Sequence, residues 1–385
     1  MSLQLTPFTV LVGENSSGKS TVLQALDFLC SVATRDIDAY LKDREWDFSD
    51  IKSQFASSSD NISFITHFEI DDKQLLWEIS INSTFGKWSI LEKITDVDTK
   101  ECYLSFGQKE PDIPYNFSQL NIESSALKTL DINIEDYKGS KYSPILFKLK
   151  SLLMSSCSFE LLSPDKMRSK GSRGKVNDIG LGGERLAAFI HGMPPQKRNE
   201  LNKALSEFIG YDVKISTTTK GQPGWVEMYL VESWADNEIK VKKRYISDGL
   251  LRIIAFLAIL VNQDRKKPAL DDFATKGVMM LDEIEDGIHP FHSEKLVERF
   301  KKVTKETKQQ IVITSHSPVI LNFIDEDDIV LMWRDQDGEI RAKPLFETIA
   351  MKETLDILNP GEVWLNYPKD SIIEMLLSQQ EDKYD

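Results

Sequence analysis

The sequence predicts an α/β protein with a parallel β-sheet at its core, and the prediction rests on three short apolar runs. The apolar run Phe8–Val12 has the length of a strand, and a glycine-rich loop and a helical pattern over Thr21–Leu29 follow it. Val278–Leu281 and Ile311–Ile313 are short apolar runs, typical of strands buried in a parallel sheet. Because these runs lie near both ends of the chain, we expect both ends to build the core.

The glycine-rich loop predicts a phosphate site. Gly13–Ser20 fits the pattern G-x-x-x-x-G-K-S between the strand and the helix. Its glycines let successive backbone N–H groups curl around a phosphate, and the helix N-terminus adds its positive end. Lys19 is expected to span the phosphates, and Ser20 to hold Mg²⁺. The sequence therefore predicts a P-loop NTPase.

Length and composition limit the class of protein. The chain has 385 residues, more than the roughly 100–200 of one domain, which predicts a core with a large insertion or second lobe. Hydrophobic and charged contents of 41% and 28% are ordinary for a globular protein, and no apolar run approaches a membrane span. Without a secretory signal or C-x-x-C spacing among Cys30, Cys102 and Cys157, we expect a cytoplasmic protein with reduced thiols and no membrane partner.

The net charge of −14 argues against a protein that is basic all over, as a nonspecific DNA coat would be. DNA would have to meet local patches. One lies within Lys166–Lys175, and the other within Lys240–Arg244. Each patch is interpretable as a DNA contact or as a solvated surface.

Between these motifs the pattern changes several times. Thr34–Asp60 is polar and is predicted to be a linker or loop. Alternation from Ile62 to Ile94 predicts antiparallel hairpins. Further elements are expected as helices over Tyr142–Leu153 and Leu186–Ile209, the second broken near Pro194, and as strands over Val213–Ser216 and Val226–Val231.

These patterns predict three parts. Residues 1–33 and 241–345 would form the ATPase core, and 34–240 an inserted β lobe with a helical subdomain. Residues 346–385 would be a C-terminal helical extension.

Acidic residues and a histidine follow the two later core strands. A P-loop enzyme needs a carboxylate near Mg²⁺ and often a second one to polarise the attacking water. Asp282 and Glu283, directly after Val278–Leu281, supply both. His316 follows the strand Gln310–Thr314, where it would lie at the ligand-binding edge of the sheet and contact a γ-phosphate or the attacking water.

A second phosphate-binding feature starts the apolar helix that follows Tyr245. Ser247 and Asp248 form an N-cap, and Gly249 in the first turn permits close approach of a ligand. Two such features in one chain suggest two subunits that face each other, each completing the other's nucleotide site.

The combined motifs resemble those of the ABC-type ATPases of the OLD, RecF and SMC group. The resemblance is carried by the phosphate loop, the Ser-Asp-Gly motif with Arg252, the acidic motif Asp282–Pro290 and Thr314–Pro318. It is closest to compact prokaryotic members that are often found in phage-defence operons. It implies an ABC-type ATPase head with an antiparallel β lobe and an inserted helical region.

The resemblance also implies cofactors and residue roles, with ATP and Mg²⁺ as the ligands. Glu283 would be the general base and His316 the switch histidine, and Asp282 would organise Mg²⁺ together with Ser20 and Gln54. ATP would contact Asn15, Gly18, Lys19, Ser20 and Thr21 of one protomer and Ser247, Asp248 and Gly249 of the other. Asp286 and Gly287 resemble a D-loop, which crosses the dimer interface in this group.

Two features depart from the group. Met1–Pro7 leaves little room for the strand that usually precedes the phosphate-loop strand, so we expect a short first sheet or a start upstream. OLD nucleases also continue into a Toprim domain, which we do not expect here. Asp335–Gly338 mimics part of a Toprim motif but is interpreted as a hairpin turn between Ile329–Trp333 and Glu339–Arg341.

The leading hypothesis is a cytoplasmic ATPase switch. ATP would close a head-to-tail homodimer or higher oligomer, and hydrolysis would open it, thereby controlling a separately encoded nuclease or toxin-like effector in anti-phage defence. The alternative is a RecF-like ATPase that clamps DNA during repair. A transporter subunit is disfavoured by the Ser-Asp-Gly motif and the long insertion, and a small-molecule kinase would leave Ser247–Gly249 without a role.

Overall fold

The structure is a computed structural model. It describes residues 1–53, 61–84, 87–107, 124–130, 143–159, 162–169, 171–172, 176, 178–219, 225–235, 237–262 and 276–378.

The chain forms two compact units. Unit 1 is Met1–Gln24, Ser158–Arg265 and Met279–Asp385, and unit 2 is Ala25–Cys157 and Lys266–Val278. This division differs from the predicted one, which placed all of 34–240 in a single insertion. Residues 158–240 belong to unit 1, where helix α8 (Pro195–Ile209) packs against helix α9 (Asp248–Val261) and strand β8 (Val213–Thr218). The boundaries therefore follow tertiary packing that changes of pattern along the sequence do not mark.

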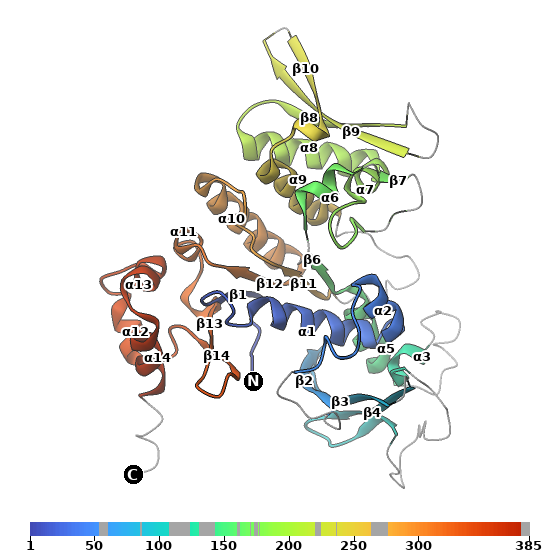
Figure 1. Ribbon diagram of the computed structural model, residues 1–385, viewed down its shortest axis with the longest axis vertical. Helices are drawn as coiled ribbons and strands as arrows, with labels where there is room; N and C mark the ends of the chain where they lie inside the picture. Colours follow the sequence, from blue (N-terminus) through green and yellow to red (C-terminus); the bar gives the residue numbers. More distant parts are fainter. Residues whose placement is uncertain are drawn as a thin grey trace. The chain divides into compact units, whose positions relative to one another are not determined.

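A six-stranded sheet carries the phosphate loop, with the strand order β14-β13-β1-β12-β11-β6 (Figure 1). β1 lies between β12 and β13 and is parallel to both, whereas β14 is antiparallel to β13. The α/β class and the hairpin after Ile329 are thus confirmed. The bounds are β1 Phe8–Val12, β6 Cys157–Phe159, β11 Val278–Leu281, β12 Gln310–Ser315, β13 Ile329–Arg334 and β14 Ile340–Pro344.

The position of β1 explains its composition. Every residue of this strand is buried, as expected for a strand with neighbours on both sides in a covered parallel sheet. Because β1 and β12 are parallel, the loops that follow them leave the sheet at the same edge.

A second sheet of unit 1 is built around β9, which pairs antiparallel with β7, β8 and β10. Its strands are β7 Gly171–Ser172, β8 Val213–Thr218, β9 Trp225–Trp234 and β10 Asn237–Lys242. The predicted strand pair over Val213–Ser216 and Val226–Val231 is confirmed.

Unit 1 also contains helices that the sequence predicted. The helical pattern over Leu186–Ile209 is confirmed, and it divides at the prolines into α7 and α8. Ile253–Val261 of α9 is buried throughout, which accounts for its continuous apolar run. The helices with residues in unit 1 are α1 Lys19–Val32, α6 Pro164–Arg168, α7 Leu186–His191, α8 Pro195–Ile209, η1 Lys243–Tyr245, α9 Asp248–Val261, α10 Pro290–Thr307, α11 Pro318–Leu321, η4 Glu326–Asp328, α12 Ile349–Thr354, α13 Pro360–Asn366 and α14 Lys369–Leu377.

None of the helices in the described part of the chain has both the length and the apolar character needed to cross a lipid bilayer.

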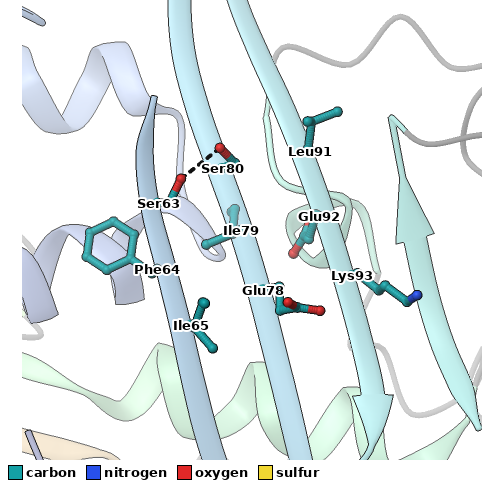
Figure 2. Close-up of a pocket in the computed structure, with 9 residues that line it drawn as sticks. All are labelled: Ser63, Phe64, Ile65, Glu78, Ile79, Ser80, Leu91, Glu92 and Lys93. Carbon is teal, nitrogen blue, oxygen red and sulfur yellow. Dashed lines mark hydrogen bonds between the residues drawn. The ribbon is translucent and has the colours of Figure 1, made fainter. Parts of the chain in front are cut away.

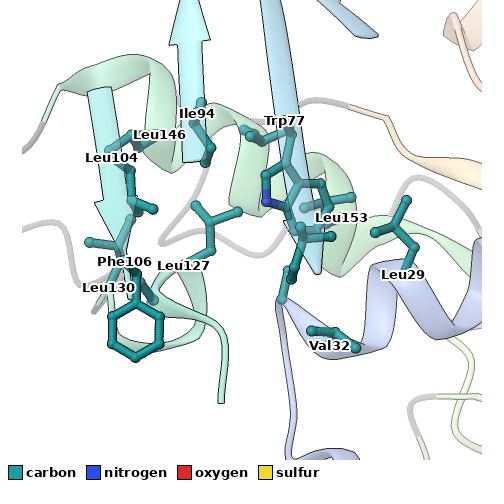
Figure 3. Close-up of a cluster of buried hydrophobic side chains, with 14 of the residues drawn as sticks. Leu29, Val32, Trp77, Ile94, Leu104, Phe106, Leu127, Leu130, Leu146 and Leu153 are labelled. Atoms are coloured by element: carbon teal, nitrogen blue, oxygen red, sulfur yellow. The ribbon is translucent and has the colours of Figure 1, made fainter. Parts of the chain in front are cut away.

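Unit 2 contains an antiparallel sheet in the order β2-β3-β4-β5, which confirms the hairpins predicted over Ile62–Ile94 and adds β5, which was not predicted. Its inward side chains pack against the second half of α1 and against α5, and Figure 3 shows Trp77 of β3 among Leu29, Val32 and Leu153. The elements that unit 2 adds are α2 Ile37–Asp43, β2 Ile62–Ile70, β3 Lys73–Thr84, β4 Lys87–Asp96, β5 Cys102–Phe106, α3 Ala126–Thr129 and α5 Pro144–Ser155.

One expectation for unit 2 was wrong. The polar segment Thr34–Asp60 was predicted to be a loop, but Ile37–Asp43 forms α2. Ile37, Tyr40 and Leu41 recur three and four residues apart and are buried, so a single short apolar stripe holds this helix on the unit 2 core.

The core of unit 2 contains a buried carboxylate. Glu92 of β4 is 1% exposed and accepts hydrogen bonds from Trp77 Nε1 at 3.0 Å, from Ser125 Oγ at 2.8 Å and from Ala126 N at 2.7 Å. Burial raises the pKa of Glu92 to about 7, and these hydrogen bonds oppose the increase. The carboxylate fastens the start of α3 to the sheet.

The opposite face of the same sheet has an open hollow of about 370 Å³ (Figure 2). Side chains from β2, β3 and β4 line it, among them Ile65, Glu78 and Lys93. None of its lining residues belongs to the predicted nucleotide or metal site.

Candidate functional site

The phosphate loop is closely packed. A Cβ on Gly13 would lie 2.3 Å from the Met332 carbonyl oxygen, and one on Gly18 would lie 2.4 Å from Ile340 Cδ1. Gly18 also has a φ of 99°, in the left-handed region that favours glycine. β13 and β14 therefore lie so close to this loop that neither glycine position has room for a side chain.

The predicted nucleotide contacts lie in this loop and in the first turn of α1. Asn15 and Thr21 are exposed, whereas Gly18 is buried and Lys19 is only 6% exposed. Lys19 Nζ turns back over the loop and donates to the carbonyl oxygens of Gly13 at 2.9 Å and Glu14 at 3.0 Å. The ammonium is thus held inside the curve of the loop.

Two opposing effects act on the pKa of Lys19. Burial lowers its pKa, and the carboxylates of Asp282, Glu283 and Glu285 oppose this decrease. These three acidic residues, which are distant in sequence from the loop, face the same cation. The structure thus assembles a lysine and an acidic cluster at one edge of the sheet.

The predicted metal ligands Ser20 and Asp282 are in direct contact. Ser20 Oγ donates to Asp282 Oδ2 at 2.8 Å. Asp282 Oδ1 accepts a hydrogen bond from Thr314 Oγ1, at the end of β12. The carboxylate is therefore held through both of its oxygens by residues of α1 and β12.

Glu283 and His316, the predicted base and switch, also lie together. His316 Nε2 is 3.2 Å from Glu283 Oε1, and both side chains are partly exposed. Glu283 has a φ of 46°, uncommon for a residue with a side chain, and its N–H donates to Thr314 Oγ1 at 2.8 Å. The left-handed turn follows directly after Asp282 and positions two consecutive carboxylates in the same site.

The predicted site did not include Glu285, which orders the segment Ser315–Ser317 (the histidine loop). Its Oε1 accepts hydrogen bonds from Ser315 Oγ at 3.0 Å, His316 N at 2.5 Å and Ser317 N at 3.1 Å. The other oxygen, Oε2, is buried without a hydrogen-bond partner. A glutamate two residues after Glu283 was a visible signal, but its partners become apparent only when β11 and β12 are adjacent.

The Ser-Asp-Gly motif starts α9, as predicted. Ser247 is the exposed N-cap and accepts a hydrogen bond from Leu250 N at 3.4 Å, and the exposed Asp248 forms an ion pair with Arg168. Gly249 is buried, and a Cβ there would lie 2.0 Å from the Gly287 carbonyl oxygen. The glycine thus permits close contact between α9 and the loop that carries Glu283.

A second contact joins the same two segments. Arg252, one turn further along α9, forms an ion pair with Asp286. The motif residues Ser247–Arg252 and the loop 283–288 are therefore packed against each other within one chain.

Several predicted residues lie elsewhere. Gln54 and the Lys170, Arg173 and Lys175 part of the first basic patch lie outside the described residues. Lys166 and Arg168 lie on α6. In the second patch, Lys240 and Lys242 are exposed on β10, Lys243 Nζ donates to the Ser169 carbonyl, and the Arg244 guanidinium stacks on Tyr245.

His289 and His292 lie at the start of α10. His289 is the N-cap residue, and its side chain accepts a hydrogen bond from Phe291 N at 3.2 Å. Within the described residues, no group of three or more His, Cys, Asp or Glu side chains is placed to hold a metal ion.

The residues at the sheet edge suit the ligands that the motifs imply. Ser20 Oγ and Asp282 Oδ2 offer two adjacent oxygen donors, the atoms that Mg²⁺ prefers. The tight glycine loop, the N-terminus of α1 and Lys19 suit a phosphate. Bound Mg²⁺ would supply positive charge to polarise a phosphoryl oxygen.

Comparison with solved structures finds heads of SMC proteins. The Smc head bound to the C-winged helix domain of ScpA is 14% identical, with a TM-score of 0.48 over 89% of this chain and 91% of that chain. The SMC head domain from Thermotoga maritima is 12% identical, with a TM-score of 0.39 over 89% of this chain and 92% of that chain. The Pyrococcus furiosus Smc head domain bound to the C-terminal domain of ScpA is 15% identical, with a TM-score of 0.40 over 92% of this chain and 94% of that chain.

No curated protein matches the chain. A family model described as "AAA domain, putative AbiEii toxin, Type IV TA system" matches residues 8–322. This match begins at β1 and ends just after the loop that carries His316. It therefore includes the phosphate loop, the motif Ser247–Arg252 at the start of α9 (the α9 motif) and the loop 283–288 (the acidic loop). The chain therefore belongs to this family of AAA domains, with a P-loop ATPase fold.

Proposed function

We propose that this protein is a cytoplasmic ATP-binding and ATP-hydrolysing switch that dimerises around ATP and controls a partner effector. The observation that carries the proposal is the assembly of Lys19, Ser20, Asp282, Glu283 and His316 at one edge of the parallel sheet. Each contributes a group that phosphoryl transfer to water requires. Lys19 supplies positive charge beside the phosphates, Ser20 and Asp282 supply oxygen ligands for Mg²⁺, Glu283 is the base, and His316 lies beside it.

In the proposed reaction, Glu283 accepts a proton from the attacking water, and His316 orients the glutamate and the transferred phosphoryl group. The 3.2 Å contact between His316 Nε2 and Glu283 Oε1 supports this pairing. Lys19 would exchange its carbonyl partners in the loop for phosphate oxygens. Mg²⁺ would be held by Ser20 and Asp282.

The exposed N-terminus of α9 supports the dimeric part of the proposal. Ser247 and Asp248 are exposed, so they are accessible to a nucleotide bound by a second copy of the chain. A head-to-tail pair would complete each site with the α9 motif of the opposite protomer. The family description, which names a putative AbiEii toxin of a Type IV TA system, supports the existence of a partner protein for this chain.

Glu283→Gln tests the chemistry. This variant keeps the size of the side chain but removes its basicity, so we expect ATP hydrolysis to fall by at least about 100-fold while ATP binding and ATP-dependent dimerisation persist. The matched control is Glu298→Gln, on the exposed side of α10. Normal hydrolysis by Glu283→Gln in the absence of contaminating ATPase would overturn the assignment.

A RecF-like DNA clamp is the second candidate, and the exposed Lys240 and Lys242 of β10 favour it. If they contact phosphates, ATP-dependent DNA binding should weaken steeply with salt. Replacing both lysines with glutamate should reduce both the affinity and the salt slope. DNA affinity that is insensitive to the two substitutions would count against the clamp.

A further inference from the structure

Thr314 lies beside the acidic residues Asp282 and Glu283 of the candidate site, and its backbone is fixed in the sheet. It lies near the carboxyl end of β12, is 0% exposed and is paired in register with Leu11 of β1. Its backbone is therefore held in the interior of the sheet, while its side chain reaches the loop that follows β11.

The Thr314 hydroxyl binds two consecutive residues of that loop. It donates its hydrogen to Asp282 Oδ1, and its oxygen accepts the Glu283 N–H at 2.8 Å. A hydroxyl has one hydrogen and two acceptor positions, so it can make both bonds at once. Ser20 Oγ holds the other oxygen of Asp282.

The second bond supports an unfavourable backbone conformation. Glu283 has a φ of 46°, and a residue with a side chain rarely adopts this left-handed conformation unless its surroundings impose it. Thr314 provides the partner for the N–H of this turn. Loss of the hydroxyl would leave that N–H without the acceptor that the turn presents to it.

We propose that Thr314 is a positioning residue, which orients Asp282 towards the metal and Glu283 towards the attacking water through a single hydroxyl. The proposal rests on the proposed function, since it assigns the supporting residue of the same site. Thr314 acts through the two carboxylates, so its loss should alter metal dependence and turnover more than nucleotide affinity.

Three variants separate this role from a general contribution to folding. Thr314→Val has the same shape without the hydroxyl, whereas Thr314→Ser keeps the hydroxyl. Thr304→Val is the matched control, because Thr304 is a buried threonine of α10 whose hydroxyl donates to the Phe300 carbonyl at 3.1 Å. Thermal unfolding of all three shows whether each protein is folded.

The measurements are Mg²⁺ titrations of ATP binding and of ATP hydrolysis, with hydrogen exchange of the Glu283 amide in the nucleotide-free protein. For Thr314→Val we expect the half-saturating Mg²⁺ concentration to rise about 10-fold or more, kcat to fall and the Glu283 amide to exchange faster, with KM for ATP changed by less than about threefold. Thr314→Ser and Thr304→Val should resemble the unmodified protein.

Unchanged Mg²⁺ dependence and unchanged Glu283 exchange in Thr314→Val would overturn the proposal, as would equal changes in Thr304→Val. If the unmodified protein binds Mg²⁺ and ATP but hydrolyses none, the proposed function fails instead. The inference about Thr314 is then still decided by the Mg²⁺ dependence of ATP binding and by the Glu283 exchange.

Discussion

At the residue scale, single carboxylates hold together segments that are distant in sequence. Glu285 gathers three donors from Ser315–Ser317, although Oε2 of its carboxylate is buried without a partner. Glu92 does the same in unit 2, where it joins β3, β4 and α3. Burying a carboxylate oxygen is costly unless it accepts hydrogen bonds, and Glu285 and Glu92 each accept hydrogen bonds from three donors.

Glu285→Ala should destabilise the protein and slow hydrolysis together. It removes the acceptor of three hydrogen bonds, which should reduce the free energy of unfolding by about 1.5–3 kcal/mol and leave His316 less well positioned. Glu285→Gln, which keeps one carbonyl oxygen, should be milder. Denaturant unfolding together with kcat checks this, and an unaltered kcat in Glu285→Ala would contradict the role given to the loop.

Glu92 predicts a pH dependence of unfolding. Its pKa in the folded protein is raised to about 7, above its ordinary value of 4.5. The folded state therefore binds the proton more tightly, so this group's contribution to stability is fully present below pH 4.5 and is lost as the pH rises through about 7. Glu92→Gln should flatten this part of the profile. Urea unfolding of both proteins at pH 5 and 7.5 measures this effect, and parallel profiles would contradict the raised pKa of Glu92.

At the scale of elements, α9 and the acidic loop form one packed assembly. Gly249 fits against Gly287, and Arg252 pairs with Asp286. A change at the start of α9 should therefore reach Glu283 through the loop.

Gly249→Ala tests that contact. A Cβ 2.0 Å from the Gly287 carbonyl oxygen cannot be accommodated without a shift, so we expect a loss of about 1–3 kcal/mol in stability and reduced hydrolysis. Gly192→Ala is the control, because its Cβ would come no closer than 3.4 Å to its nearest neighbour, the Ala188 carbonyl oxygen. Hydrogen exchange of the loop 283–288 follows the shift directly. Unchanged exchange in Gly249→Ala would contradict the coupling of α9 to this loop.

The elements also show how far the sequence predicts the fold and the site. Strands such as β1 and helices such as α9 are evident because their apolar runs are fully buried. The helix α2 was missed because only three buried side chains hold it in a polar segment. Glu285 and Thr314 could not be assigned from sequence, because their partners lie some thirty positions away, across adjacent strands.

At the scale of the whole molecule, the proposed function depends on the association of two copies of the chain. One chain has a phosphate loop with its acidic cluster, and an exposed Ser247 at the start of α9. In a symmetric head-to-tail dimer, each nucleotide would be bound by the loop of one protomer and the α9 motif of the other. ATP would then control assembly, and assembly would control the effector.

Subunit complementation tests whether each nucleotide site is shared between two copies of the chain. Lys19→Ala disables the phosphate loop, and Ser247→Arg blocks the α9 motif, so each variant alone should hydrolyse almost no ATP. In an equimolar mixture, half of the dimers are mixed and each mixed dimer has one intact site, so about a quarter of the unmodified activity should return. Activity no greater than the sum of the separate variants, with mixed dimers shown to form, would contradict a site shared between two copies of the chain.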